Sequence, residues 1–296
     1  MQAALLPDRG VVKIAGGDAR RFLHGLVTAD VSQLAPGQSR FAALLTPQGK
    51  IIADFILVEA AAGDGGGFFL DCPRALAATL VERLTFYRLR AKVTIEDLSH
   101  KLSVLAAWSG TGTTECGLAY PDPRLPALGL SCILPPELAA EAAAELGAML
   151  TDADAYEAHR IAHGIPRGGV DFSYGDAFPH ETDMDQLGGV DFSKGCYIGQ
   201  EVVSRVEHRG TARSRIVPIA YDGFAPEPGT AVIAGDKEIG TLGSTGGGRG
   251  LAMLRLDRAE EAMAAEQPLV AGGVAIRVVK PAWARFAFPG EAKAVG

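Results

Sequence analysis

The pattern of hydrophobic and polar positions divides the chain into strands and helices of ordinary length. Residues 41–60 hold two apolar runs on either side of the turn sequence TPQGK, which is typical of a β-hairpin with largely buried strands. Residues 19–31 repeat apolar positions at helical spacing behind Asp18, a candidate N-cap. Residues 135–150 are rich in alanine, glutamate and leucine and predict the clearest helix of the chain.

Shorter segments extend this mixture of strands and helices. Residues 92–97 alternate in the manner of a half-buried strand, and the apolar run at 102–108 is expected to continue the same sheet. Pro73 suits the first turn of a helix that carries leucines at helical spacing. Residues 151–165 and 200–209 predict two further helices.

The texture of the sequence changes after Gly210. Short β-rich runs alternate with turn residues, interrupted by one helical piece at 256–266, and this predicts a small antiparallel barrel or sandwich. We therefore expect two domains, an α+β region at 1–211 and a β-barrel at 212–296.

Composition and charge exclude several classes of protein. Of the 296 residues, 48% are hydrophobic and 21% are charged, which is typical of a soluble globular protein. The net charge of −7 argues against a nucleic-acid binder that relies on overall charge. No apolar run is long enough to cross a bilayer and no secretory signal is recognisable, so we expect no membrane partner and a cytoplasmic location.

The cysteines are too scattered for a metal site or a disulfide framework. No two of them have the C-x-x-C spacing of a zinc site, and an iron–sulfur cluster held by this chain alone would need about four well-placed thiolates. We therefore predict no resident metal. The four cysteines are Cys72, Cys116, Cys132 and Cys196.

One glycine-rich loop concentrates the candidate chemistry. Residues 188–201 read GGVDFSKGCYIGQE, and their first six residues repeat those of 168–173. Glycines let a backbone approach a ligand closely, and a cysteine near Lys194 and a helix N-terminus can have a lowered pKa. The alternative for Cys196 is a buried, inert thiol. The repeat itself is weak evidence that two similar loops, ending in Glu181 and Glu201, face one cavity.

Charged residues follow on the helix behind this loop. Glu201 and Arg205 share one helical stripe, where they form either a solvated ion pair or part of a site. A basic run could bind the glutamate tail of a folate or a short RNA, although a solvated face is the simpler interpretation. The run consists of Arg205, His208, Arg209, Arg213 and Arg215.

The sequence KGCYIGQEVVSR resembles the motif of the YgfZ family of folate-binding proteins, which act in iron–sulfur cluster biogenesis. That family is related to the glycine-cleavage T-protein, an aminomethyltransferase dependent on tetrahydrofolate. Residues 14–31, 46–55 and 239–257 are similar to further parts of both families. The resemblance implies a T-protein-like multidomain α+β fold. In it, two interleaved subdomains with mixed sheets and helices surround a central folate cavity, followed by the barrel.

The resemblance also assigns roles to single residues. Glu181 stands where the T-protein has a glutamate that holds the pterin ring, and a carboxylate can accept two parallel hydrogen bonds from the N–H edge of an aminopterin. Asp54 stands where the T-protein has a paired Asp-Asp, one aspartate of which positions the folate nitrogen and assists C–N cleavage; the alternative for Asp54 is a carboxylate at the end of a strand. Because one acid of the pair is missing, aminomethyl transfer is in doubt.

The function implied by the resemblance is a tetrahydrofolate-binding accessory factor for assembly or repair of iron–sulfur clusters in selected enzymes. Its partners would be folate and those enzymes or their assembly machinery, with Cys196 as the functional thiol. The alternatives are a folate-dependent one-carbon transferase that uses Asp54, and a tRNA-associated binding module. The residues expected to bind folate are Glu181, Lys194, Tyr197, Gln200, Glu201 and Arg205.

Overall fold

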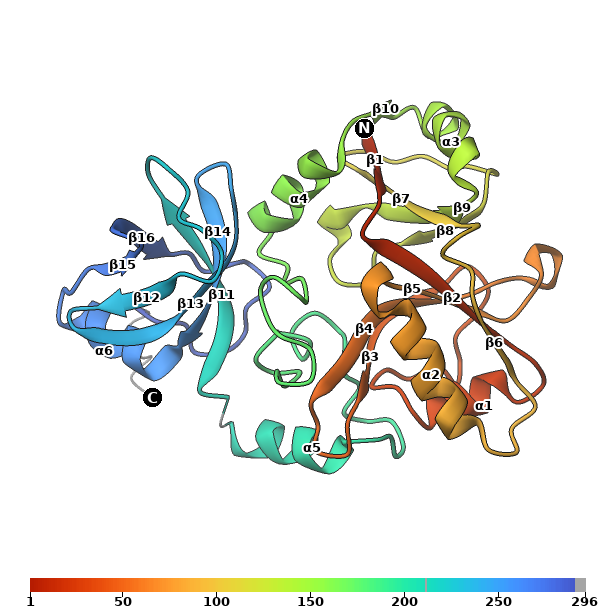
Figure 1. Cartoon of the computed structure of the whole chain (residues 1–296), viewed down its shortest axis with the longest axis horizontal. Coiled ribbons are helices and arrows are strands. Elements are labelled where there is room, and N and C mark those ends of the chain that lie inside the picture. Colours follow the sequence, from red (N-terminus) through yellow and green to blue (C-terminus); the bar gives the residue numbers. More distant parts are fainter. Residues whose placement is uncertain (211, 291–296) are drawn as a thin grey trace. The chain divides into compact units, whose positions relative to one another are not determined.

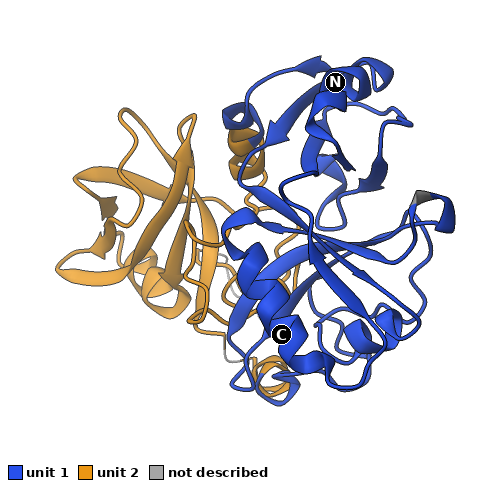
Figure 2. Ribbon diagram, turned by 45° about the vertical axis from the view of Figure 1, so that its right-hand side comes forward, with its two compact units in different colours: residues 1–156, 187–202 blue, residues 157–186, 203–296 orange. Residues whose placement is uncertain are grey.

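The structure is a computed structural model that describes residues 1–210 and 212–290. The predicted domain ends at 211 and 296 lie outside these residues. The chain forms two compact units (Figure 2). Unit 1 contains residues 1–156 and 187–202, and unit 2 contains residues 157–186 and 203–296.

The elements labelled in Figure 1 follow one another along the chain as strands with six intervening α-helices among the described residues. The helices are α1 (Ala19–His24), α2 (Ala77–Arg88), α3 (Ala139–Glu145), α4 (Ala153–Ala162), α5 (Gln200–Arg209) and α6 (Leu256–Ala264). The strands before α4 are β1 (Gln2–Leu6), β2 (Arg9–Ala15), β3 (Ser39–Leu45), β4 (Ile51–Glu59), β5 (Phe68–Pro73), β6 (Thr94–Asp97), β7 (Ser103–Trp108), β8 (Leu118–Pro121), β9 (Leu130–Leu134) and β10 (Met149–Leu150). The strands after α5 are β11 (Ser214–Tyr221), β12 (Ala231–Ala234), β13 (Lys237–Gly246), β14 (Arg249–Arg255), β15 (Leu269–Ala271) and β16 (Val274–Val278).

Unit 1 is built from two five-stranded sheets that share an apolar core. The first sheet has the order β3-β4-β5-β2-β6 and the second has the order β10-β1-β7-β9-β8. Strand β4 explains the arrangement, because its side chains alternate between two cores. Phe55 and Leu57 pack with α1 and α2, whereas Ile56 and Val58 pack between the sheets. Burial on both faces accounts for the continuous apolar sequence of this strand.

Three secondary-structure predictions for unit 1 are corrected. The helix expected at 19–31 ends at His24, and the helix expected at 135–150 ends at Glu145. Gly147 then adopts φ +63°, a conformation that suits glycine, and the chain continues into β10. The run at 102–108 forms β7 of the second sheet, not a continuation of β6 in the first.

The predicted barrel is confirmed in unit 2. Strands β11-β14-β13-β12-β15-β16 pair in this order and close on themselves with antiparallel neighbours. Alternate residues of most strands fill the interior, and Ala259 and Ala262 of α6 join that core. Closure removes the free edges that an open sheet of short strands would expose.

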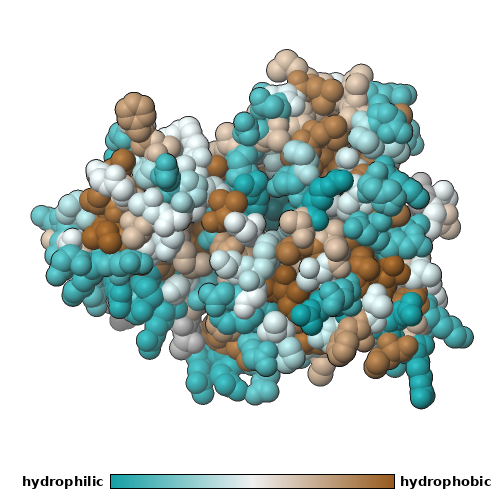
Figure 3. Space-filling model, in the orientation of Figure 1, coloured by the Kyte–Doolittle hydropathy of each residue, from teal (hydrophilic) through white to brown (hydrophobic). Residues whose placement is uncertain are grey.

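The exposed surface is mixed in character. On the face drawn in Figure 3, hydrophilic and hydrophobic residues are interspersed. Large apolar side chains that are exposed include Phe86, Leu89, Phe192 and Phe224. Within the described part of the chain, none of the helices combines the length and apolarity needed to pass through a bilayer.

Candidate functional site

The loop that precedes α5 is fixed by Lys194. This side chain is buried, and its Nζ donates hydrogen bonds of 2.8, 2.5 and 2.9 Å to the carbonyl oxygens of His24, Val27 and Ala29. Burial lowers the pKa of Lys194 to about 8, although Asp30 and Asp191 oppose the shift. The side chain therefore ties the loop to the end of α1 and the turn after it.

Asp191 shapes the backbone immediately before Lys194. Its Oδ1 accepts hydrogen bonds from the Ser193 amide at 2.8 Å, the Ser193 hydroxyl at 2.7 Å and the Lys194 amide at 3.1 Å. Burial acts to raise the pKa of Asp191, but these hydrogen bonds outweigh it and hold the pKa below its usual value. Thr28 adds two links, since its carbonyl accepts from the Asp191 amide and its hydroxyl donates to Gly189.

The functional thiol predicted from the sequence lies at the surface. Cys196 is exposed, as is Gly195 before it, while Tyr197 after it is buried. Burial raises the pKa of Tyr197 to about 12, so the phenol stays protonated at neutral pH. Exposure excludes the alternative that Cys196 is an inert core residue. Its predicted role in chemistry stays a prediction.

Glycines allow the loop to lie tightly against the β3–β4 hairpin. Gly199 has φ +82°, and a Cβ atom there would lie 2.6 Å from the carbonyl oxygen of Thr46. Gly49 has φ +80°, and its Cβ atom would lie 3.0 Å from the Cβ of Val202. Only glycine combines a positive φ with so close a contact at the Cβ position. This explains why glycine directly precedes Gln200 and Glu201 at the start of α5.

The remaining predicted residues of the motif lie on α5. Gln200 is half-buried, and Glu201 and Arg205 are exposed. Arg215 of the basic run is buried and bound to carboxylates, which leaves it out of any exposed basic surface. Contact of the α5 residues with folate stays a prediction.

Asp54 lies between the two sheets of unit 1. It is buried on β4 on the same side as Ile56, while its neighbours Ala53 and Phe55 point into the core beside α1 and α2. A buried polar network lies on that inter-sheet side. Arg9 pairs with Asp71 at 2.6 Å and is electrostatically coupled to Asp54. An acid in place of Ala53 or Phe55 would point into apolar surroundings. Asp54 lies on the inter-sheet side, whereas Glu59, the other acid of β4, pairs with Arg20 at 2.6 Å.

Glu181 lies in unit 2, where it lines a cavity of about 410 Å³. Its Oε2 accepts a hydrogen bond of 2.9 Å from the amide of Phe178, which orients the carboxylate. The cavity combines acidic and hydroxyl groups with apolar side chains, and the described residues that line it include no cationic one. The other lining side chains include Val170, Asp171, Phe172, Ser173, Asp176, Ala177, Ser214, Thr241, Leu242 and Met253.

A buried ion pair lies beside this cavity. Asp171 Oδ2 is 3.0 Å from Nη1 of Arg160, and its Oδ1 accepts from the Ser244 amide at 2.6 Å. Asp171 therefore belongs to a buried, hydrogen-bonded ion pair. Asp191, its counterpart in the repeated sequence GGVDFS, instead accepts hydrogen bonds within a turn. The repeat does not produce the same local geometry twice.

Sequence reasoning missed a second buried cluster in unit 2. Arg215 donates to Asp183 at 3.0 Å and to both oxygens of Asp185 at 2.8 Å. His180 lies 3.0 Å from the Glu207 carboxylate. The sequence ETDMDQ shows that this segment is acidic. It does not indicate that the aspartates are buried, because aspartates are rarely buried unless they are paired.

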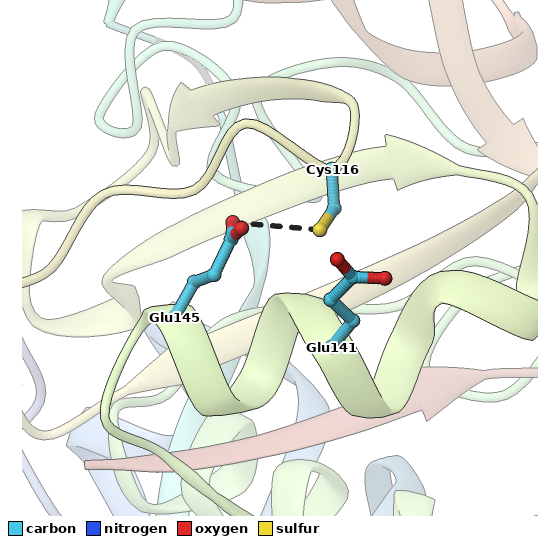
Figure 4. Close-up of side chains that lie close together, drawn as sticks. All are labelled: Cys116, Glu141 and Glu145. Atoms are coloured by element: carbon cyan, nitrogen blue, oxygen red, sulfur yellow. Dashed lines mark hydrogen bonds between the residues drawn. The ribbon is translucent and has the colours of Figure 1, made fainter.

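A smaller cluster lies on unit 1. The sulfur of Cys116 is 3.4 Å from Glu145 Oε2 and close to the carboxylate of Glu141 (Figure 4). Glu145 also accepts from the hydroxyl of Thr114, which helps to hold its pKa below the usual value. Desolvation and, after it, the neighbouring carboxylate of Glu145 raise the pKa of Cys116, which disfavours the thiolate that metals bind.

Two family models match the chain. The first, described as the CAF17 C-terminal beta-barrel domain, matches residues 213–286, and the second, the GCVT N-terminal domain, matches residues 8–109. The crystal structure of the glycine cleavage system aminomethyltransferase T from Bartonella henselae superposes with a TM-score of 0.76 at 16% identity, over 97% of this chain and 87% of that one. This likeness confirms the T-protein-like fold.

Curated relatives give the family. A human protein, the iron-sulfur cluster assembly factor IBA57, mitochondrial, is 30% identical over 84% of this chain and 76% of its own length. A homologue from Mycosarcoma maydis is 34% identical over 74% of this chain. The chain belongs to the IBA57 family.

This assignment refines the resemblance to YgfZ. The relatives carry the name IBA57, and YgfZ is a related family; the iron–sulfur assembly family and its T-protein-like fold are confirmed. The chain spans 57% of the Mycosarcoma maydis protein and 58% of the Pyricularia oryzae one.

The cytoplasmic location expected from the sequence is corrected by the same comparison. The fungal and human IBA57 relatives are named as mitochondrial proteins. The expectation rested on the lack of a recognisable targeting signal, which is weak evidence about where a protein works.

Proposed function

We propose that the chain is a tetrahydrofolate-binding accessory factor in the assembly or repair of iron–sulfur clusters in selected enzymes. Two lines of support converge on cluster assembly: the IBA57 relatives are named as assembly factors, and the loop before α5 presents one exposed thiol on a fixed backbone. The exposed thiol on its anchored loop is the observation that carries the proposal.

An exposed cysteine suits work on a cluster that passes through the protein as cargo. Its thiolate can ligate iron, accept a sulfur atom from a donor persulfide or undergo thiol–disulfide exchange. A single thiolate holds a cluster only together with ligands from another protein, because a cluster needs about four. The proposal therefore includes a partner that supplies the other ligands.

The cavity at Glu181 supports the folate part of the proposal. About 410 Å³ lies within the range of small-molecule pockets, and its mixture of apolar walls with a few polar groups is the usual character of such sites. Glu181 would accept hydrogen bonds from the N–H edge of a pterin, with Phe172 and Met253 against the ring. When bound, tetrahydrofolate supplies a carrier for one-carbon units.

The role of the thiol is tested in cells that lack the protein. A Cys196→Ala chain is expected not to restore the activity of iron–sulfur enzymes, while a matched Cys116→Ala chain restores it. Protein levels measured by immunoblot and tetrahydrofolate binding should be equal in the two variants. Full restoration by Cys196→Ala would remove the thiol from the proposal.

Folate binding is tested by calorimetry with tetrahydrofolate. Glu181→Gln is expected to weaken binding by roughly tenfold to a hundredfold, because hydrogen bonds to a charged group contribute about 1.5–3 kcal/mol. Asp176→Asn, in the same cavity wall, serves as the control and should weaken it much less. If no heat is detected with the parent chain, the folate part of the proposal fails while the assembly part stands.

Asp54 favours a second candidate, a folate-dependent aminomethyltransferase-like activity. The support is the position of this carboxylate on the inter-sheet side near Arg9, where a buried acid can serve in proton transfer. Turnover of a methylamine-type donor with tetrahydrofolate that vanishes in Asp54→Asn would establish it. The absence of turnover with every donor tried would retire it.

A further inference from the structure

Four consecutive residues of the loop divide into an inner and an outer pair. Lys194 and Tyr197 are each 7% exposed, whereas Gly195 and Cys196 between them are exposed. The chain is thus buried at Lys194, exposed at Gly195 and Cys196, and buried again at Tyr197. The side chains that bracket the thiol both point into unit 1.

The ammonium group of Lys194 is fully used inside the protein. An ammonium has three N–H donors and no acceptor, and all three donors have carbonyl partners at 2.5–2.9 Å. His24 is the last residue of α1, where helix carbonyls lack intrahelical donors. A cation there is also favoured by the helix dipole. Lys194 thus completes the end of α1 from a distant part of the chain.

The phenol ring of Tyr197 forms the other side of this anchor. Nζ of Lys194 lies 5.1 Å from the ring centroid, a cation–π distance. The hydroxyl of Tyr197 is buried and has no hydrogen-bond partner among the described residues. Tyr197 therefore contacts Lys194 through its ring, whereas its hydroxyl makes no hydrogen bond to the described residues.

Gly195 lies directly over the same turn. A Cβ atom at this position would be 3.9 Å from Nε2 of His24, and Nδ1 of His24 faces Asp30 at 3.2 Å. Asp30 and Asp191 are the carboxylates that act on the Lys194 charge. Gly195 therefore lies next to the end of α1, on the same side of the loop as the groups that surround Lys194.

We infer that Lys194 and Tyr197 are positioning residues that clamp the loop so that Cys196 projects in one fixed direction. This inference rests on the proposed role of the thiol and concerns how that thiol is presented. The clamp lowers the number of orientations that the sulfur can adopt, which favours transfer to a partner that must meet it in one geometry. Neither anchor needs to touch the cargo or the folate.

The experiment measures the mobility of a nitroxide spin label on Cys196 by electron paramagnetic resonance. A Cys116→Ser background leaves Cys196 as the accessible thiol among the described residues, since Cys72 and Cys132 are buried. Lys194→Met keeps an unbranched side chain that is one atom shorter and removes every donor. We expect the label to move about twofold faster or more in this variant, while Lys101→Met, at an exposed lysine, leaves the spectrum unchanged.

Further variants keep the test decisive. Lys194→Gln, which retains two N–H donors, provides a second measurement if Lys194→Met does not fold, and circular dichroism verifies folding of each. Tyr197→Leu should loosen the label and Tyr197→Phe should not. An unchanged spectrum in every Lys194 variant would overturn the clamp.

Enzyme restoration in cells separates this inference from the function on which it rests. If Cys196→Ala retains full activity but Lys194→Met still frees the label, the clamp stands and the proposed function of the thiol fails. If Tyr197→Phe keeps the label immobile yet abolishes folate binding or cluster assembly, the phenol acts on a ligand and its assignment as an anchor alone is wrong.

Discussion

At the scale of single residues, Asp183 illustrates how burial changes an acid. Its side chain is inaccessible to solvent, its backbone has φ +59°, and its Oδ2 has no hydrogen-bond partner among the described residues. Burial raises the pKa of Asp183 well above its usual value, and Asp185 adds to this, while Arg215 opposes it. One guanidinium faces two carboxyl groups, and burial makes the deeper one, Asp183, harder to ionise than an exposed aspartate.

The sign of the resulting pH dependence follows from proton binding. Above its ordinary pKa of about 4, Asp183 loses its proton in the unfolded chain but retains it in the folded one. The folded state then binds more protons than the unfolded state. The contribution of this residue to stability is therefore greatest at low pH and falls as the pH rises towards the folded pKa.

Asp183→Asn is expected to stabilise the protein at pH 7 by about 1–2 kcal/mol and to have a smaller effect near pH 4. Asparagine is neutral, keeps an acceptor for Arg215 and tolerates positive φ. Thermal unfolding at the two pH values measures the difference. Asp222→Asn, at an exposed residue, is the control and should show no gain; a loss of stability at pH 7 for Asp183→Asn would mean that its carboxylate is ionised.

At the scale of elements, Arg160 joins three parts of unit 2. From α4 it reaches Asp171 at 3.0 Å, the hydroxyl of Ser244 on β13 at 2.7 Å and the carbonyl of Ile165. Both members of the Arg160–Asp171 pair are buried. Such a pair contributes little net stability over an apolar replacement, but removing one partner leaves an uncompensated charge.

Arg160→Met should therefore destabilise unit 2 by about 3–5 kcal/mol, because Asp171 would remain buried without its cation. Chemical denaturation with the fluorescence of Trp283, in the same unit, provides the measurement. Arg255→Met removes an exposed partner of Asp257 and is expected to cost no more than about 1 kcal/mol. If the two substitutions lowered the free energy of unfolding equally, burial of the ion pair would not be the cause of the larger expected loss.

At the scale of the whole molecule, the path of the chain links the barrel to an earlier segment. Residues 157–186 belong to unit 2 together with the barrel, although residues 187–202 intervene in unit 1 (Figure 2). The amide of Ile216 donates to the carbonyl of Glu181, and Arg215 is paired with Asp185. The barrel strands therefore have partners that lie before the domain boundary predicted near residue 212.

We expect a fragment of residues 212–296 to melt several degrees below a chain in which residues 157–186 are joined by a Gly-Ser linker to residues 203–296. The shorter fragment leaves the buried Arg215 without its carboxylates, which is costly. Circular dichroism during heating compares the two. Identical melting temperatures would mean that the barrel folds independently, as the predicted domain 212–296 requires.

Local patterns predicted much of the fold correctly. The β3–β4 hairpin, α2, α5 and the barrel were recognisable because their apolar positions repeat with the period of the element and end at turn residues. The failures have physical causes as well. High helix propensity at 146–150 yielded to a glycine with positive φ and to pairing of β10 with β1, a contact between residues far apart in sequence.

The candidate site was predictable in composition but not in arrangement. The motif around Cys196 marked the loop, yet lysine is among the residues least expected to be buried, so the inward position of Lys194 could not be foreseen. Likewise, the acidic run near Asp183 gave no sign that one of its carboxylates would be enclosed beside Arg215.

By itself the sequence determined many of the elements, the barrel and the position of a cysteine in a glycine-rich loop, because periodicity, turn residues and motif spacing are local properties. The tertiary structure alone decided which side chains of that loop are enclosed and which project. That choice depends on carbonyl groups of His24, Val27 and Ala29, more than 160 positions earlier in the chain, which only folding brings to Lys194.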